Sequence, residues 1–172
     1  MRFFAAAMAF VAAALVPGDR PGLPLAEGFV VAHRESVRGG TIEERVPQGE
    51  TVQEWSRMIT LLTINADMPP GDYIDAFERH FAAECPGAPI GPRTATKVGA
   101  YPTLDGRSDC ALLPATGKPQ SYFYRIFRVG STLHIAQIGF RRVPSASDTA
   151  WAQAQLSALG FCAAASVDPV CQ

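Results

Sequence analysis

The segment from Ser121 to Arg142, SYFYRIFRVGSTLHIAQIGFRR, decides the fold of this chain. Two apolar-rich runs, 122–129 and 132–141, flank the dipeptide Gly130-Ser131. Glycine suits the first position of a type II′ turn, which joins two antiparallel strands through two residues. The segment therefore predicts a β-hairpin.

The two-residue turn fixes the register of this hairpin. It places Val129 opposite Thr132, so that Phe127 lies opposite His134 and Phe123 opposite Ile138 on one face. We call this side the Phe face, and we expect it to be the core side because it is the more apolar one.

The opposite side of the hairpin, which we call the Tyr face, is more polar. Tyrosine rings beside a guanidinium group can stack on a sugar, peptide or aromatic ligand and hydrogen-bond to it. The alternative is that these are ordinary residues of a half-exposed strand, with one ring covering Gly139 across the ladder. The candidate binding residues are Tyr122, Tyr124, Arg128 and Gln137.

Three further strands are expected on the amino-terminal side. The runs 29–34 and 41–46 flank a turn at 38–40 that contains two glycines, which predicts a first hairpin. The run 58–64, MITLLTI, is apolar on both faces and is typical of a central strand.

The segment PQGETVQEWSRMIT, residues 47–60, offers a choice between a reactive site and a structural junction. Pro47 ends a strand because it has no N–H group, and Gly49 allows a turn. Thr51 and Glu54 have the spacing of a capping box, which predicts a helix of one or two turns anchored by Trp55. Every distinctive residue has a structural role, so we interpret the segment as a junction.

Two longer helices complete the pattern. Asp72 is the expected N-cap of a helix that runs to about Glu84 and has three apolar residues on one face. Ser145 and Asp148 predict the start of a last helix, and Gly160 its C′ stop. Between the helices, strands are expected near 93–99 and 108–113, with a turn at 105–106. The apolar positions are Ile74, Phe77 and Phe81 in the first helix and Trp151, Leu156 and Leu159 in the second.

These elements predict an α+β fold: an antiparallel sheet of about six or seven strands with two main helices packed against it. The span 27–172 has the length of a single domain. The chain has a formal net charge of −1 and scattered basic residues, so nothing in it indicates a nucleic-acid surface.

The first 26 residues have the composition of a secretory signal peptide. One cation, Arg2, precedes an apolar run from Phe3 to Val16 that is shorter than the roughly 20 residues of a membrane span. Cleavage after Ala14 and cleavage after Ala26 both remain open. We expect a periplasmic or secreted protein with no membrane span in the mature chain.

The cysteine count agrees with export. Four cysteines in a chain bound for an oxidising compartment favour disulfides over a metal site. Of the three possible pairings we favour Cys85 with Cys110 and Cys162 with Cys171, the second closing the carboxy-terminal tail.

The sequence contains the components of several reactive sites, each with a simpler explanation. Cys110 beside Asp109 could be a nucleophile, but an even cysteine count favours a disulfide. The three histidines lack metal-ligand spacing, and the close carboxylate pairs lie at expected helix starts, where the helix dipole favours acidic groups. We expect no cofactor and no metal. These residues are His33, His80 and His134, and the pairs Glu50 with Glu54 and Asp72 with Asp75.

With its Pro47–Thr60 segment, Cys85-Pro86 after the first long helix and a tyrosine-rich hairpin, the chain resembles uncharacterised exported proteins of Gram-negative bacteria. Members of that group carry a similar P-x-G-E-T-x-x-x-W-x-x-M-I-T segment and a few cysteines. The order of elements is also similar to the photosystem accessory-protein and Mog1 type of sandwich. The first resemblance implies an exported protein, and the second implies helices covering an antiparallel sheet.

We therefore expect a non-enzymatic binding or accessory domain of the cell envelope, whose partner is a small molecule or an envelope protein. The alternative is a small periplasmic hydrolase with a site assembled from scattered residues.

Overall fold

The computed structural model describes residues 20–37, 39–89 and 91–162. Seven antiparallel strands form one sheet in the order β2-β3-β4-β8-β7-β6-β5. A separate pair joins β1 (Arg20–Gly22) to β9 (Gly160–Cys162). The strands of the main sheet are β2 (Phe29–Val37), β3 (Gly40–Pro47), β4 (Arg57–Asn65), β5 (Thr94–Val98), β6 (Tyr101–Leu113), β7 (Lys118–Val129) and β8 (Thr132–Phe140).

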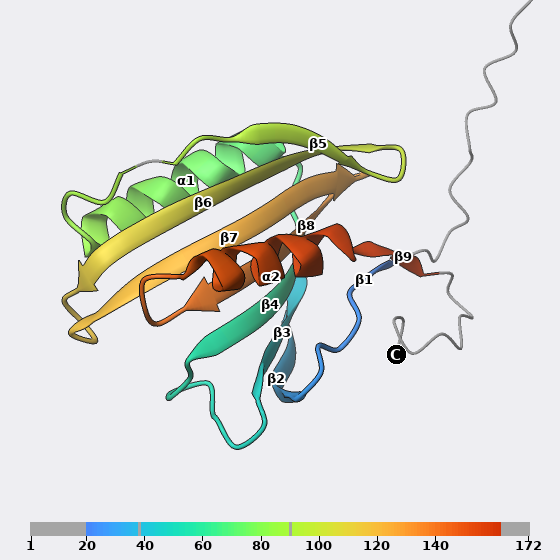
Figure 1. Ribbon diagram of the computed structural model, residues 1–172. Helices are drawn as coiled ribbons and strands as arrows, with labels where there is room; N and C mark the ends of the chain where they lie inside the picture. Colours follow the sequence, from blue (N-terminus) through green and yellow to red (C-terminus); the bar gives the residue numbers. More distant parts are fainter. Residues whose placement is uncertain (1–19, 38, 90, 163–172) are drawn as a thin grey trace, which may run out of the picture.

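Two helices cover opposite faces of this sheet, as Figure 1 shows: α1 (Pro70–Glu84) lies behind it and α2 (Ala146–Ser157) in front. The predicted α+β class, with a sheet of six or seven strands and two main helices, is therefore confirmed. Each helix closes its own core. The core beneath α2 includes Phe123, Phe127, Ile138, Phe140 and Leu156, and the core beneath α1 includes Ile74, Tyr124, Ile126, Leu133 and Ile135.

The β7–β8 hairpin has the register predicted from its turn. Val129 pairs with Thr132, Phe127 with His134 and Tyr122 with Gly139. The Phe face is a core side, as expected, but the Tyr face is a core side as well because α1 packs on it. The hairpin sequence alone left open whether a helix covers the Tyr face, and the structure shows that α1 does.

The first hairpin is present as β2 and β3, and β4 is an interior strand, so both predictions are confirmed. The short helix expected after Pro47 does not form. The backbone N–H of Thr51 donates to the carbonyl of Glu54 while its hydroxyl accepts from the N–H of Glu54, which closes a compact loop. Trp55 is buried in this loop, as predicted.

The turn expected at residues 105–106 lies elsewhere. β5 and β6 pair around a turn at Gly99, which has a positive φ of 56°, and Gly106 lies inside β6. A Cβ atom on Gly106 would lie 2.3 Å from the hydroxyl oxygen of Tyr124. Gly106 is therefore required because the ring of Tyr124 covers it, and not because the chain turns there.

The ends of the helices differ in part from the prediction. The N-cap of α1 is Pro69, and Asp72 lies within the first turn. The capping box of α2 is present as predicted, with Ser145 and Asp148 satisfying each other's backbone N–H groups. Gly160 does not stop α2 but begins strand β9.

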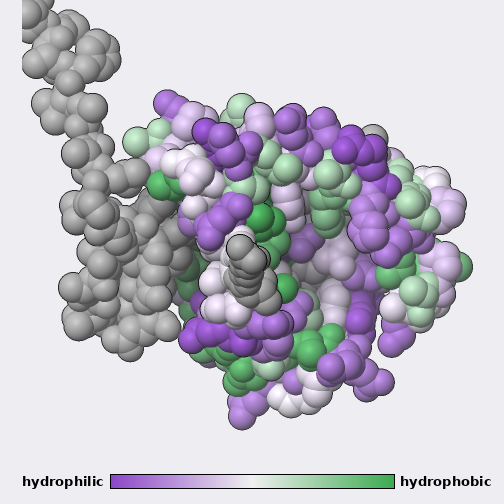
Figure 2. All heavy atoms as spheres, turned by 180° about the vertical axis from the view of Figure 1, so that it is seen from behind, coloured by the Kyte–Doolittle hydropathy of each residue, from purple (hydrophilic) through white to green (hydrophobic). Residues whose placement is uncertain are grey.

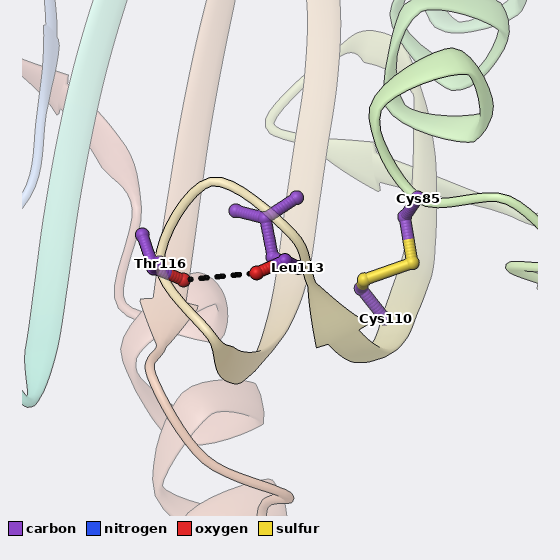
Figure 3. The surroundings of a disulfide bond; sticks show 4 residues. All are labelled: Cys85, Cys110, Leu113 and Thr116. Carbon is purple, nitrogen blue, oxygen red and sulfur yellow. Dashed lines mark hydrogen bonds between the residues drawn. A yellow bond between two sulfur atoms is a disulfide. The ribbon is translucent and has the colours of Figure 1, made fainter.

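A disulfide between Cys85 and Cys110 joins the end of α1 to β6, which confirms the first predicted pair. Figure 3 shows it beside the turn in which the Thr116 hydroxyl bonds to the carbonyl of Leu113. The second predicted pair involves Cys171 and lies outside the described residues. No helix in the described ranges is long and apolar enough to cross a membrane.

Figure 2 shows the molecule from the side opposite to Figure 1. Hydrophobic residues appear there in small patches among hydrophilic ones. Concave features are therefore the better guide to a functional site.

Candidate functional site: a groove beside helix α2

A groove of about 510 Å³ lies between α2 and the strands β6 and β7, on the Phe face of the sheet. It exists because α2 packs over β7 and β8 and leaves the adjoining part of β6 uncovered. We call it the α2 groove. Its polar wall on the helix consists of Thr149, Gln153 and Ser157.

These three residues recur at every fourth position, so they form a stripe along one side of α2. At a rise of 1.5 Å per residue the stripe extends over about 12 Å. The helix start is fixed by the capping box of Ser145 and Asp148. The hydrogen bond from the Arg142 guanidinium is the main cause that lowers the pKa of Asp148 to about 2, and the bonds from Ser145 contribute to the same shift. The stripe therefore lies on a helix with a fixed start.

An ion pair on the floor of the groove ties α2 to the sheet. Arg125 donates from Nε and a terminal nitrogen to both carboxylate oxygens of Asp105, at 2.8 and 2.7 Å. Its other terminal nitrogen donates to the carbonyl oxygen of Leu156 at 2.6 Å. Because these groups already bind each other, their role at this point is to hold the floor in place.

Arg107 is the cation of the groove that faces solvent most. Its side chain is 34% exposed, and its guanidinium lies over the ring of Phe123, 4.7 Å from the ring centroid. Its Nε donates to Asp109 at 2.9 Å. Stacking and the ion pair fix the guanidinium plane, so Arg107 can present its terminal N–H groups to a ligand in the groove.

The predicted binding residues of the Tyr face do not form a site together. Tyr122 and Tyr124 lie on the side of the sheet that α1 covers, although Tyr124 also lines the α2 groove. Tyr124 is 1% exposed, and its hydroxyl donates to Glu78 at 2.7 Å. Burial, assisted by Glu78, raises the pKa of Tyr124. Arg128 is exposed at the end of β7 and pairs with Asp67.

The other two residues of that set are also partly covered. Tyr122 packs edge-on against Phe77 and Phe81 of α1. It lies beside Gly139, as the ordinary structural interpretation of the hairpin predicts. Gln137 lines a small cavity of about 20 Å³ together with Tyr124. The structure therefore does not bring the four residues together on an open surface.

The other residues that the sequence offered as a nucleophile or as metal ligands also lie apart from one another. Cys110 is in the disulfide, and the three histidines lie apart, His33 near Glu35, His80 near Glu84 and His134 against Phe127. No three residues among His, Cys, Asp and Glu come together as a metal site within the described part of the chain.

One member of each close carboxylate pair has a structural partner. Glu50 accepts from the N–H and the hydroxyl of Ser56. Asp75 pairs with Arg93.

The α2 groove was missed at the level of the sequence. Its helix stripe could have been found, because three polar residues recur every fourth position beside an apolar stripe. The position of Arg107 could not, because the strand that carries it was expected to begin only after the residue pair 105–106.

Comparisons with known proteins identify no family for the chain. No family model matches, and no curated protein matches. Among solved structures, the chain is similar to LpqN of Mycobacterium tuberculosis, a protein involved in cell envelope biogenesis. The identity is 12%, the alignment covers 85% of this chain and 86% of that chain, and the TM-score is 0.45. A similarity of this degree carries no argument about the function of this chain.

Proposed function

We propose that the protein is an exported binding or accessory domain of the cell envelope and that it binds its ligand in the α2 groove. The apolar amino-terminal segment supports export. The Cys85–Cys110 disulfide supports an oxidising compartment, because such bonds rarely persist in the cytosol.

The observation that carries the proposal is the polar stripe of α2 facing Arg107 across the groove. Two hydroxyls and an amide along about 12 Å suit an extended polar ligand. Gln153 and Ser157 can donate and accept hydrogen bonds, whereas the Thr149 hydroxyl donates to the carbonyl of Ser145 and can accept one from a ligand. A short oligosaccharide or a peptide segment has this chemistry. Arg107 adds donors for a carbonyl, hydroxyl or carboxylate oxygen.

The hydrolase alternative would need a free acid or base in the groove. Asp105 accepts two bonds from Arg125, and Asp109 accepts from Arg107. Among the described residues that line the groove, we find no feature that favours hydrolysis.

The proposal is tested by titrating isotope-labelled protein with defined oligosaccharides and tripeptides while recording amide chemical shifts. We expect a member of the panel to shift the amides of residues around Gln153 and Arg107. The variant Gln153→Leu should weaken this binding at least about fivefold, the effect of losing one or two hydrogen bonds.

Gln48→Leu is the matched control, because Gln48 is exposed outside the groove. It should leave the affinity unchanged. Equal affinities for the two variants, shifts confined to other surfaces, or the absence of any shift across the panel would each contradict the proposal.

A further inference from the structure

A second concave site lies on the other side of the sheet, where the Tyr face extends past the end of α1. Lys118 shares this face with Tyr122 and Tyr124 because side chains alternate along β7. The space beside it measures about 470 Å³ and is walled by the loop 50–56 and by the turn between β6 and β7. We call it the loop pocket; its lining includes Glu50, Glu54, Trp55, Thr116, Lys118 and Arg141.

Arg141 is held at the base of the loop pocket. Its guanidinium lies 4.4 Å from the ring centroid of Trp55, and one terminal nitrogen donates to the carbonyl of Gln53. Its Nε is buried and has no hydrogen-bond partner. Arg141 makes no ion pair among the described residues, so its charge favours an anionic group in the pocket.

Lys118 adds a second cation at the rim. Its side chain is exposed and makes no ion pair within the ranges that the structure describes. Lys118 begins β7 and Arg141 directly follows β8, and these two strands are neighbours in the sheet. They can therefore contact the same anionic group.

The two carboxylates of the pocket differ in their bonding. Glu50 is engaged, because its oxygens accept from the N–H and the hydroxyl of Ser56 at 2.6 and 2.7 Å. Glu54 is exposed, and its carboxylate has no ion-pair partner among the described residues. The pocket thus holds unpaired charges of both signs on opposite walls.

We propose that the loop pocket binds a small zwitterion, with its carboxylate or phosphate against Lys118 and Arg141 and its ammonium group against Glu54. A simple anion would be repelled by Glu54, and a simple cation by Lys118 and Arg141. A ligand with both charges satisfies each wall. Free amino acids carry this pair of charges, and so does the phosphoethanolamine head group of membrane lipids.

Three probes of nearly equal size test the requirement for both charges: 4-aminobutyrate, butyrate and butylamine. We expect 4-aminobutyrate to bind at least about fivefold more tightly than either singly charged probe, as measured by calorimetry and by amide shifts around Trp55. Two further probes, phosphoethanolamine and vesicles containing phosphatidylethanolamine, distinguish a free zwitterion from a lipid head group. Binding to the vesicles would indicate a lipid head group, and binding to the soluble zwitterions alone a free metabolite.

Two charge-removing variants locate the site. Lys118→Met and Glu54→Gln should each weaken zwitterion binding, whereas Lys97→Met and Glu27→Gln, which change exposed residues elsewhere, should not. All four changes are at exposed positions, so the melting temperature is the check that each variant is folded. Equal affinity for the three probes, no binding of any zwitterion at millimolar concentration, or unaltered affinity in the first two variants would overturn the proposal.

Discussion

At the scale of single residues, Tyr124 constrains two other positions, Gly106 and Glu78. Its ring occupies the space that a side chain at position 106 would fill, and its hydroxyl donates to Glu78. Glu78 is only 4% exposed and also accepts from Arg93. A buried carboxylate is tolerated because these donors satisfy it.

We predict that Tyr124→Phe lowers the free energy of unfolding by about 1–3 kcal/mol, because Glu78 loses a buried donor while the ring stays in place. Urea denaturation measures the change. Tyr73→Phe is the control: Tyr73 is half-buried on α1, and its hydroxyl makes no hydrogen bond among the described residues. Similar losses in both variants would show that the bond to Glu78 is unimportant.

His134 makes a second prediction at this scale. It stacks on Phe127, its Nδ1 is buried without a partner, and burial lowers its pKa from 6.5 to about 4. Between these values the unfolded chain binds the proton and the folded chain does not. The contribution of His134 to the free energy of unfolding should therefore be fully present above about pH 6.5. It should decrease as the pH falls towards 4.

Denaturation at a series of pH values checks this dependence. His134→Phe should flatten the slope between pH 6.5 and about 4.5. The lowered pKa values of Asp148 and Glu43 act below this window, since their ordinary values are 3.8 and 4.5. A slope that persists in His134→Phe would contradict the assignment.

At the scale of elements, the hairpin and the loop 50–56 differ in how well local sequence defines them. The β7–β8 register follows from a two-residue turn, so the residues themselves determine it. The loop contains a capping-box pattern, yet no helix forms there. The carboxylate of Glu50 binds the backbone and hydroxyl of Ser56 across six residues, and no local pattern encodes that bond.

We predict that Glu50→Ala lowers the free energy of unfolding by about 1.5–3 kcal/mol, the range for hydrogen bonds to a charged group. Glu54→Ala is the matched control in the same loop and should change it by less than about 0.5 kcal/mol. Trp55→Ala should cost about 3–5 kcal/mol because it removes a buried ring. Thermal and urea denaturation measure these changes. Equal stability of the two glutamate variants would show that the bonds between Glu50 and Ser56 do not stabilise the loop.

At the scale of the whole molecule, the fold class could be predicted because alternation and helix periodicity reflect which side of each element is buried. The pairing of β4 with β8 and the placement of one helix on each face could not. They depend on contacts between residues far apart in the chain, such as Tyr124 with Glu78. The α2 groove has the same origin, since it arises where α2 leaves β6 uncovered. The strand β1 was missed because three residues, RPG, carry no periodic pattern.

The fold also bears on where the signal peptide that we propose would be removed. Leu23 is 1% exposed and packs in the core beneath α2 together with Ala26. The buried guanidinium of Arg45 donates to the carbonyls of Leu23 and Pro24 at 2.8 and 3.0 Å. Cleavage after Ala26 would remove both acceptors and two core residues, Leu23 and Ala26.

We therefore predict that signal cleavage occurs upstream of Arg20, in agreement with the site after Ala14. Mass spectrometry and amino-terminal sequencing of protein recovered from a bacterial periplasm check this. A chain produced without residues 1–26 should lose roughly 3 kcal/mol or more, because it lacks the Leu23 side chain and leaves buried donors of Arg45 unpaired. A chain produced without residues 1–14 is the control and should match the exported protein. A mature protein that begins at Glu27 and is as stable as this control would show that Leu23 and Pro24 are dispensable to the folded domain.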